Sequence, residues 1–386
     1  MSTTLPGLLS LTEADLGRRL EFDVIDKQNC LIFKAGKVID QDMVDQVAGR
    51  PIHSWPHAHD VKSEHVRAEL FRLFPEEEVH RLMDVIDSAG QALGATLDSL
   101  RFKSDIKVSR VVNSVSQVAI ETERHLQAMI VALTLKTPDA ELDLADRLLE
   151  HSTQLSSLGI VIAVMSGLDK RTVFEIGVAG LLHDLSLILR SGSFDPSQCK
   201  KNHETRTEFR QHPLATVELL KRLPGLSSES LLLIKQVHEQ CDGSGYPEGI
   251  VSEKILPGAK ILNVADAYLS LVRPLRGQAI VSSDALAYLC HHASRGKFDR
   301  SILRLLVKHM SMYPLGSVVE LDDRTPAIVV GNNPLAPLSP VVSIHGKEVN
   351  LETANRTIEK VATNGLVNGS RVSKRRINEV FWRLDA

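Results

Sequence analysis

The chain has 386 residues, of which 43% are hydrophobic and 24% are charged, and its formal net charge at pH 7 is −3. This composition is typical of a globular protein, and the length predicts two or three domains. Because the charge is nearly balanced, it excludes the strongly basic surface that binds nucleic-acid polymers or membranes by net charge. Any nucleotide ligand must therefore be held by local groups.

Cysteine spacing and apolar runs indicate a reducing compartment and no membrane span. The four cysteines are widely scattered and form no CxxC pair: Cys30, Cys199, Cys241 and Cys290. This spacing favours neither a disulfide framework nor a thiolate zinc site. The first residues lack the basic and apolar regions of a secretory signal. The longest apolar run, LGIVIAVMSGL at 158–168, is about half as long as a membrane-spanning helix. We expect a cytoplasmic protein.

The first part of the chain, residues 1–62, is expected to be a small β-rich module. The runs FDVID, CLIFKAG and KVID are rich in β-branched and aromatic residues and alternate with turn residues. Polar residues 51–62 then predict a linker. Its His57 and His59 are interpreted as linker residues rather than metal ligands, because no other ligand type is nearby in the sequence.

Two helical blocks follow, at 63–135 and 136–318, in which apolar residues recur at helical spacing. We interpret the first block as a helical connector. The second contains nearly all of the candidate functional residues. It is broken by Gly, Pro and Asn clusters at 191–196, 224–225 and 242–249.

The end of the chain, residues 319–386, is expected to be a β-containing extension. The runs GSVVELDD, TPAIVVG and SPVVSI are typical of short strands, with turns at Asp322-Asp323 and Gly331-Asn332-Asn333. The fold class is therefore mainly α, with a β-rich module at the start and short strands at the end.

His183 and Asp184 are adjacent polar residues in an otherwise apolar helical pattern, GVAGLLHDLSLIL. Burying them without partners would be costly. One buried histidine is ordinarily a satisfied core residue, but further ligand types lie at or beside apolar helical runs: His151, which is expected to open a helix, His212, His238 and Asp266. Such side chains in one helical block need partners, so together they predict a metal site.

The ligand types also indicate the metal chemistry. Imidazole and carboxylate groups suit iron, manganese, zinc or nickel better than magnesium, which prefers oxygen ligands. Two such ions roughly 3.5–4 Å apart, sharing one carboxylate and a hydroxide, would suit in-line displacement at phosphorus. Asp184 is the natural bridging residue.

A second signal is the sequence DGSGYP at residues 242–247. A glycine-rich segment with a proline is commonly only a turn. This one begins four residues after His238, however, so its backbone amides and Tyr246 could lie beside a metal site, where a phosphate or a base would bind.

Together these motifs resemble the HD-GYP family of cyclic di-GMP phosphodiesterases, and their order and intervals fit: His183-Asp184, His212-Pro213, His238-Glu239, DGSGYP and Ala265-Asp266. The resemblance covers about residues 140–345 and implies an HD-type all-helical phosphohydrolase fold. It implies that a hydroxide bridging two metals opens cyclic di-GMP to linear pGpG, and in some members the reaction continues to GMP.

The resemblance also implies the roles of individual residues. His183 and Asp184 form the catalytic pair. A first metal is held by His151, His183, Asp184 and Asp266, and a second by Asp184, His212 and His238. Iron and manganese are preferred over zinc and nickel. The implied substrate-binding residues are Gly245, Tyr246, Pro247, Arg273 and Arg276. Arginine suits a phosphate better than lysine, although these two arginines also fit an ordinary exposed turn.

Three positions depart from the family pattern: Arg147, Leu187 and Val237. Ser186 and Leu187 stand where the family has glycine and lysine, and loss of that cation could slow the reaction by about 10²–10³. Val237 replaces a histidine ligand of the second metal, so that metal would bind more weakly. Arg147 replaces a glutamate of the members that bind three metals, so a third metal is not expected.

Two hypotheses follow from these motifs and departures. The first is a bacterial phosphodiesterase acting on cyclic di-GMP in second-messenger signalling. The second is a catalytically degenerate HD-GYP protein that acts as a cyclic-dinucleotide receptor or signalling scaffold. In either case the partner is cyclic di-GMP, protein partners could dock on the exposed GYP loop, and no nucleic-acid polymer or membrane is expected. A homodimer is left open.

Overall fold

The computed structural model describes residues 8–9, 11–20, 23–26, 31–34, 36–50, 52–55, 61, 63–102, 107–136, 142–192 and 203–363. The described chain divides into two compact units. Residues 74–312 form the helical unit, and the described residues before and after it form the other. His57 and His59 lie outside the described residues, as do Cys30 and Cys199.

The N-terminal sheet has four antiparallel strands in the order β1-β4-β2-β3. Its elements are β1 (Leu8–Leu9), the 3-10 turn η1 (Glu13–Asp15), β2 (Asp23–Asp26), β3 (Leu31–Phe33), α1 (Gln41–Val47) and β4 (Ile52–Trp55). The expected linker was wrong at its start, because residues 52–55 pair with both β1 and β2. Ile52 is buried in this small core, a feature that the polar residues around it concealed.

The C-terminal sheet has five antiparallel strands in the order β8-β7-β6-β5-β9. Its strands are β5 (Val318–Leu321), β6 (Pro326–Gly331), β7 (Val341–Ile344), β8 (Lys347–Asn350) and β9 (Ile358–Thr363). The first three correspond to the expected runs, whereas β8 and β9 were not predicted. Helix α2 (Ser63–Leu73) contacts this sheet, and Arg72 donates a 2.8 Å hydrogen bond to the Gly346 carbonyl.

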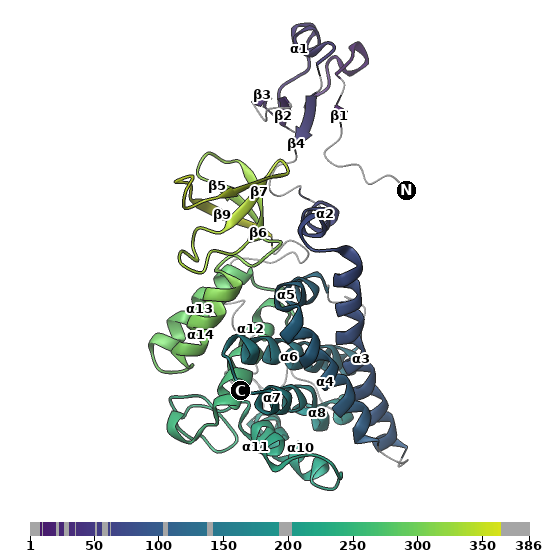
Figure 1. Cartoon of the computed structure of the whole chain (residues 1–386), viewed down its shortest axis with the longest axis vertical. Helices are drawn as coiled ribbons and strands as arrows, with labels where there is room; N and C mark the ends of the chain where they lie inside the picture. Colours follow the sequence, from purple (N-terminus) through teal and green to yellow (C-terminus); the bar gives the residue numbers. More distant parts are fainter. Residues whose placement is uncertain are drawn as a thin grey trace. The chain divides into compact units, whose positions relative to one another are not determined.

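Helices α3 to α14 belong to the helical unit, which contains the candidate site; Figure 1 shows most of these helices with their labels. The helices of this unit are α3 (Glu76–Arg101), α4 (Val108–Arg124), α5 (Leu126–Leu135), α6 (Leu144–Met165), α7 (Lys170–Leu182), α8 (Leu185–Arg190), α9 (His203–Arg210), α10 (His212–Leu220), α11 (Ser228–Gln236), the 3-10 turn η3 (Ser252–Lys254), α12 (Pro257–Val272), α13 (Ser282–Ser294) and α14 (Arg300–Met310). Helices α3 and α4, from the expected connector, share one apolar core with α6, α7 and α12. The expected mainly α fold class is confirmed.

Helices α6 and α7 pack closely because small residues face each other. A side-chain carbon on Gly180 would lie 2.9 Å from the Ser156 Cα, so only glycine fits there. The Ser156 hydroxyl donates a 2.7 Å hydrogen bond to the Gly177 carbonyl. Asp143 and Asp169 cap the two helix N-termini through backbone N–H groups. This packing fixes the two helices that position His151 and His183.

Two segments are long and apolar enough to cross a membrane by length and composition, Leu144–Met165 and Lys170–Arg190. The most apolar windows of these segments are 78% and 83% buried inside the protein. The apolar side chains of these two segments therefore pack in the core of the helical unit.

Two helix boundaries differ from the expectation. His151 does not open a helix, because α6 begins two turns earlier at Leu144, where Asp143 supplies the N-cap. His183 and Asp184 do not continue a single helix, because α7 ends at Leu182 and α8 begins at Leu185. The apolar residues before and after His183-Asp184 are all buried, so the helical periodicity of the sequence continued through the turn and did not reveal it.

Candidate metal centre

Six side chains from five segments converge in the helical unit, and none is more than 6% exposed. They lie on α6, in the turn between α7 and α8, at the start of α10, just after α11 and in the middle of α12: His151, His183 with Asp184, His212, His238 and Asp266. All six residues that were expected to hold metal are therefore buried close to one another.

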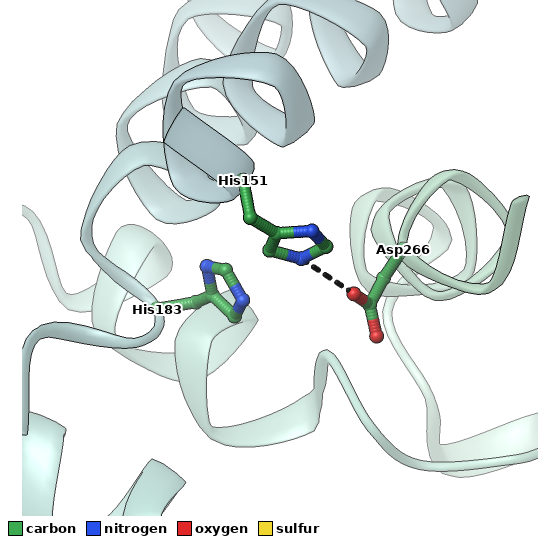
Figure 2. A group of neighbouring side chains, drawn as sticks. All are labelled: His151, His183 and Asp266. Carbon is green, nitrogen blue, oxygen red and sulfur yellow. Dashed lines mark hydrogen bonds and ion pairs between the residues drawn. The ribbon is translucent and has the colours of Figure 1, made fainter. Parts of the chain in front are cut away.

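Asp266 lies between two histidines. Its Oδ1 is 2.8 Å from the Nε2 of His151, and its Oδ2 is 3.3 Å from the Nδ1 of His238. Figure 2 shows His151 and Asp266 facing each other across this bond, with the His183 ring beside them. The ligand atoms of His151, His183 and Asp266 all lie within 4.8 Å of one another.

Asp184 lies between another pair of histidines. Its Oδ2 is 3.2 Å from the His183 Nε2, and its Oδ1 is 3.2 Å from the His212 Nε2. One carboxylate thus faces a ring nitrogen from the turn after α7 and another from α10. This is the arrangement that a residue bridging two cations requires.

Backbone carbonyls orient two of the imidazoles. The Nδ1 atom of His183 lies 2.9 Å from the Gly180 carbonyl oxygen, and that of His212 lies 2.7 Å from the Phe209 carbonyl oxygen. A carbonyl can only accept, so in each ring Nδ1 carries the proton and donates it. In the neutral ring, Nε2 is then left with a lone pair that points into the cluster.

The cluster consequently contains more acceptors than protons. The Nε2 atoms of His212 and His238 are 3.1 Å apart, and the His238 Nδ1 faces Asp266. Burial, the largest cause, lowers the pKa of His238 to about 4, and the neighbouring His212 and His183 lower it further while Asp266 opposes the shift. A neutral His238 carries one ring proton, so it can donate a hydrogen bond to His212 or to Asp266 but not to both.

A divalent cation fits this donor set. The Nε2 of His183 is buried and makes no hydrogen bond within the described part of the chain. Two buried carboxylates among imidazoles that carry lone pairs also leave negative charge that a cation would balance. The described residues therefore contain groups that could bind metal.

Two buried hydroxyls, from Ser186 and Thr216, tie the segment after Asp184 to the helix of His212. Ser186 Oγ donates to the His212 carbonyl over 3.0 Å, and Thr216 Oγ1 donates to Ser186 Oγ over 2.8 Å. The Ser186 N–H in turn donates to Thr216 Oγ1 over 3.3 Å. The serine that stands in place of the family's glycine thus links two candidate ligands.

Glu239 holds the segment that directly follows the GYP loop, residues 242–247. This buried carboxylate accepts the backbone N–H groups of Glu248, Gly249 and Ile250 over 2.7, 3.2 and 3.0 Å. Gly245 has no room for a side chain, because an added carbon would lie 2.3 Å from the Gln240 nitrogen. The loop is consequently fixed against the residues that follow His238.

Tyr246 packs on the metal centre from the loop side. Its ring is 5% exposed and stacks on His238, with centroids 4.9 Å apart and an interplanar angle of 27°. Its N–H donates to the His238 carbonyl over 3.1 Å. Pro247 follows through a cis peptide bond and is half-buried. Tyr246 is therefore in direct contact with a candidate ligand.

The two candidate phosphate-binding arginines differ in their surroundings. Arg273 ends α12, about two turns after Asp266, and its Nη2 donates a 2.7 Å hydrogen bond to the Leu133 carbonyl. Its Nη1 is buried and makes no hydrogen bond to a described residue. Arg276 is exposed. Arg273 thus caps the end of α5 and keeps one donor available.

The three departures from the family pattern have visible consequences. Leu187 and Val237 are buried and belong to the main apolar core. Arg147, one turn before His151, donates from Nε to the Leu142 carbonyl over 2.9 Å. Two of the three positions thus add apolar packing where the family has a ligand or a cation.

Sequence reasoning missed residues that contact the segments carrying the candidate ligands: Thr216, Glu239, Asn263 and Arg210. Glu239 was noticed only as part of a motif, and the amide of Asn263 donates to the Val237 carbonyl over 3.1 Å. The spacing of Asn263 to Asp266, one helical turn, was a usable signal. The contacts of Thr216 and Arg210 join segments about 30 residues apart and left no local pattern.

Part of the chain is similar to known proteins. Residues 138–302 match the family model described as HD domain. Cyclic di-GMP phosphodiesterase PA4108 of Pseudomonas aeruginosa is 27% identical over 71% of this chain and 64% of its own length. Cyclic di-GMP phosphodiesterase PdeB of Borreliella burgdorferi is 27% identical over 52% of this chain and 53% of its own length. The chain thus spans between half and two thirds of the length of these relatives.

A solved structure shows the same fold. Bd1817, described as a HDG"Y"P protein from Bdellovibrio bacteriovorus, matches 77% of this chain and 97% of its own with a TM-score of 0.50 and 14% identity. The chain is thus similar to HD-domain proteins over residues 138–302. Its resemblance to the HD-GYP proteins, expected from the motifs, is confirmed.

Proposed function

We propose that this chain is a metal-dependent phosphodiesterase that opens cyclic di-GMP to linear pGpG. The observation that carries the proposal is the buried cluster of four histidines and two aspartates, in which ligand atoms converge without enough protons to satisfy them. The printed names of the relatives in Pseudomonas aeruginosa and Borreliella burgdorferi support the substrate. We place the protein in the cytoplasm.

The cluster would hold two cations, which we propose to be iron or manganese. His151, His183, Asp184 and Asp266 would hold the first, and Asp184, His212 and His238 the second. When bound, divalent cations polarise a phosphoryl oxygen and activate water as a nucleophile. The contacts of Asp184 to both His183 and His212 support its bridging role.

The remaining residues bind and orient the substrate in this proposal. Arg273 keeps a buried Nη1 donor for a phosphate oxygen, and exposed Arg276 adds a second positive charge. The GYP loop, in which Asp242 and Ser244 are exposed, offers a surface to protein partners. A homodimer stays a prediction.

The degenerate receptor is the weaker alternative, because the chain keeps every residue of the first metal position in contact with another ligand. Product analysis separates the two. Metal-loaded protein is incubated with cyclic di-GMP and the nucleotides are separated by chromatography. We expect linear product from the wild type and at least about a hundredfold less from Asp184→Asn. Intact cyclic di-GMP with both proteins would contradict the proposal.

A further inference from the structure

Arg210 connects the helix before His212 to the GYP loop. It is the last residue of α9, and its Nη2 donates a 3.2 Å hydrogen bond to the Gly245 carbonyl. The guanidinium carbon also lies 5.4 Å from the centroid of the Tyr246 ring. One side chain thus contacts both the backbone and the aromatic ring of a loop 35 residues away.

The contact continues through Tyr246 to a candidate ligand. The Tyr246 ring has the Arg210 guanidinium near it and also stacks on the His238 imidazole. Phe209 packs edge-on against Tyr246, with ring centroids 5.9 Å apart. Arg210, Tyr246 and His238 are therefore in contact in series.

The direction of the His238 ring matters for the candidate site. The His238 Nε2 must point toward the His212 Nε2, 3.1 Å away, for both atoms to share one cation. Groups behind a ligand ring fix its orientation and commonly set metal affinity. A cation near the face of Tyr246 attracts that ring electrostatically, and the hydrogen bond to Gly245 fixes the backbone beside it.

We propose that Arg210 is a positioning residue that holds Tyr246 against His238 and so keeps the second metal position in order. The inference rests on the proposed function for the identity of the metal site but does not require turnover. Arg210 acts through Tyr246 rather than by contact with the reacting atoms. Its role is specific, because the planar guanidinium can serve the carbonyl and the ring together.

The variants are Arg210→Ala, Arg210→Lys and the control Arg190→Ala. Arg190, at the end of α8, pairs over 3.2 Å with Glu208, which lies on α9 two residues before Arg210. Both side chains of this pair are exposed. Hydrogen exchange at the Tyr246 amide, which bonds to the His238 carbonyl, is followed in metal-free protein by mass spectrometry. Manganese affinity is measured separately by titration.

We expect Arg210→Ala to speed exchange in residues 240–250 several-fold and to weaken manganese binding about tenfold or more. Arg210→Lys should recover part of the affinity, because a cation stays near the ring while the forked geometry is lost. Arg190→Ala should leave both quantities unchanged.

Two results would overturn the inference. Unchanged exchange and manganese affinity with a raised KM for cyclic di-GMP would make Arg210 a substrate contact. Equal changes in Arg210→Ala and Arg190→Ala would indicate a general effect on α9. If the wild type binds manganese but never turns over cyclic di-GMP, the proposed function fails. Hydrogen exchange and manganese affinity still decide the role of Arg210 in that case. If the wild type binds no manganese, the exchange measurement decides alone.

Discussion

At the scale of single residues, the candidate ligands are prepared by the backbone around them. His183 and His212 each donate from Nδ1 to the carbonyl three residues earlier, so each Nε2 is free of its proton when the ring is neutral. Burial lowers the pKa of His238 to about 4, so this ring is neutral near pH 7. Metal binding needs imidazole nitrogens that carry no proton, so these ring orientations favour cation binding even in the metal-free protein.

The lowered pKa of His238 predicts acid sensitivity of the metal-free protein. Its pKa is about 4 when folded and about 6.5 when unfolded, so between these values only the unfolded chain takes up the proton. The free energy of unfolding should therefore fall by up to about 3 kcal/mol as the pH drops from about 6.5 to 4. Urea denaturation of chelator-treated protein measures this loss.

The His238→Asn variant should lose less stability over the same pH range than the wild type. His291→Asn, which alters an exposed histidine on α13, provides the control and should follow the wild type. Parallel curves for the wild type and His238→Asn would contradict the assignment.

The Ser186 and Thr216 hydroxyls give a second test at this scale. Thr216→Val keeps the shape but leaves the Ser186 N–H without its acceptor, which should cost about 1–3 kcal/mol of stability. Metal content should fall as well, because Thr216 holds Ser186, and Ser186 links the Asp184 segment to His212. Thr122→Val is the matched control, since that hydroxyl is equally buried but bonds only within its own helix. Equal metal content in both variants would show that the pair has no role at the site.

Sequence alone was enough to name the candidate ligands that the fold brings together, but not the residues that support them. A histidine or an aspartate inside an apolar run stands out, because burying it without a partner is costly. Ser186 and Thr216 gave no such signal, since hydroxyls are ordinary in helices. Arg210 looked like any surface residue of a polar helix, and its contact with Tyr246 depends on tertiary structure.

At the scale of elements, turns and helix ends place the chemistry. Asp184 sits in the turn between α7 and α8, and His238 just follows α11. Helical periodicity located these elements but continued through the turn at 183–184, because residues on both sides are apolar and buried. Helical periodicity also missed the start of α6. That start depends on the Asp143 side chain, which caps the helix by accepting the Asp146 N–H, rather than on any apolar residue.

The GYP loop should tolerate no side chain at Gly245. Gly245→Ala would bring a carbon to 2.3 Å from the Gln240 nitrogen and 2.5 Å from the His238 carbonyl. Because these are backbone atoms, the loop must move, and we expect a loss of about 1–3 kcal/mol together with weaker metal binding. Gly192→Ala is the control, since nothing lies within 4 Å of the added carbon. Thermal unfolding and metal analysis of both variants decide the matter, and similar values for the two would be inconsistent with the tight fit.

At the scale of the whole molecule, one helical unit contains the entire candidate site. The core that surrounds it runs from α3 to α14, so residues first interpreted as a connector help to build it. The mainly α class could be predicted from periodicity. The strands β4, β8 and β9 could not, because their short sequences contain charged or polar residues beside the apolar ones.

Metal removal should destabilise this helical unit. Ligand that binds only the folded state adds roughly 2.7 kcal/mol at a hundred times its dissociation constant. For a unit of this size that corresponds to a Tm shift of roughly 5–10 °C. We expect a chelator to lower the Tm of the wild type by this amount and to leave the Tm of Asp184→Asn nearly unchanged. An equal shift in both would mean that metal binds elsewhere.

The central claim is that the buried cluster binds metal in order to cleave cyclic di-GMP. The most direct test adds manganese or iron to metal-free protein under anaerobic conditions and follows both bound metal and linear dinucleotide. The account predicts no product without metal, product that rises as the chain fills toward two ions, and almost none from Asp184→Asn. Two ions bound per chain with cyclic di-GMP held intact would contradict it and leave a receptor.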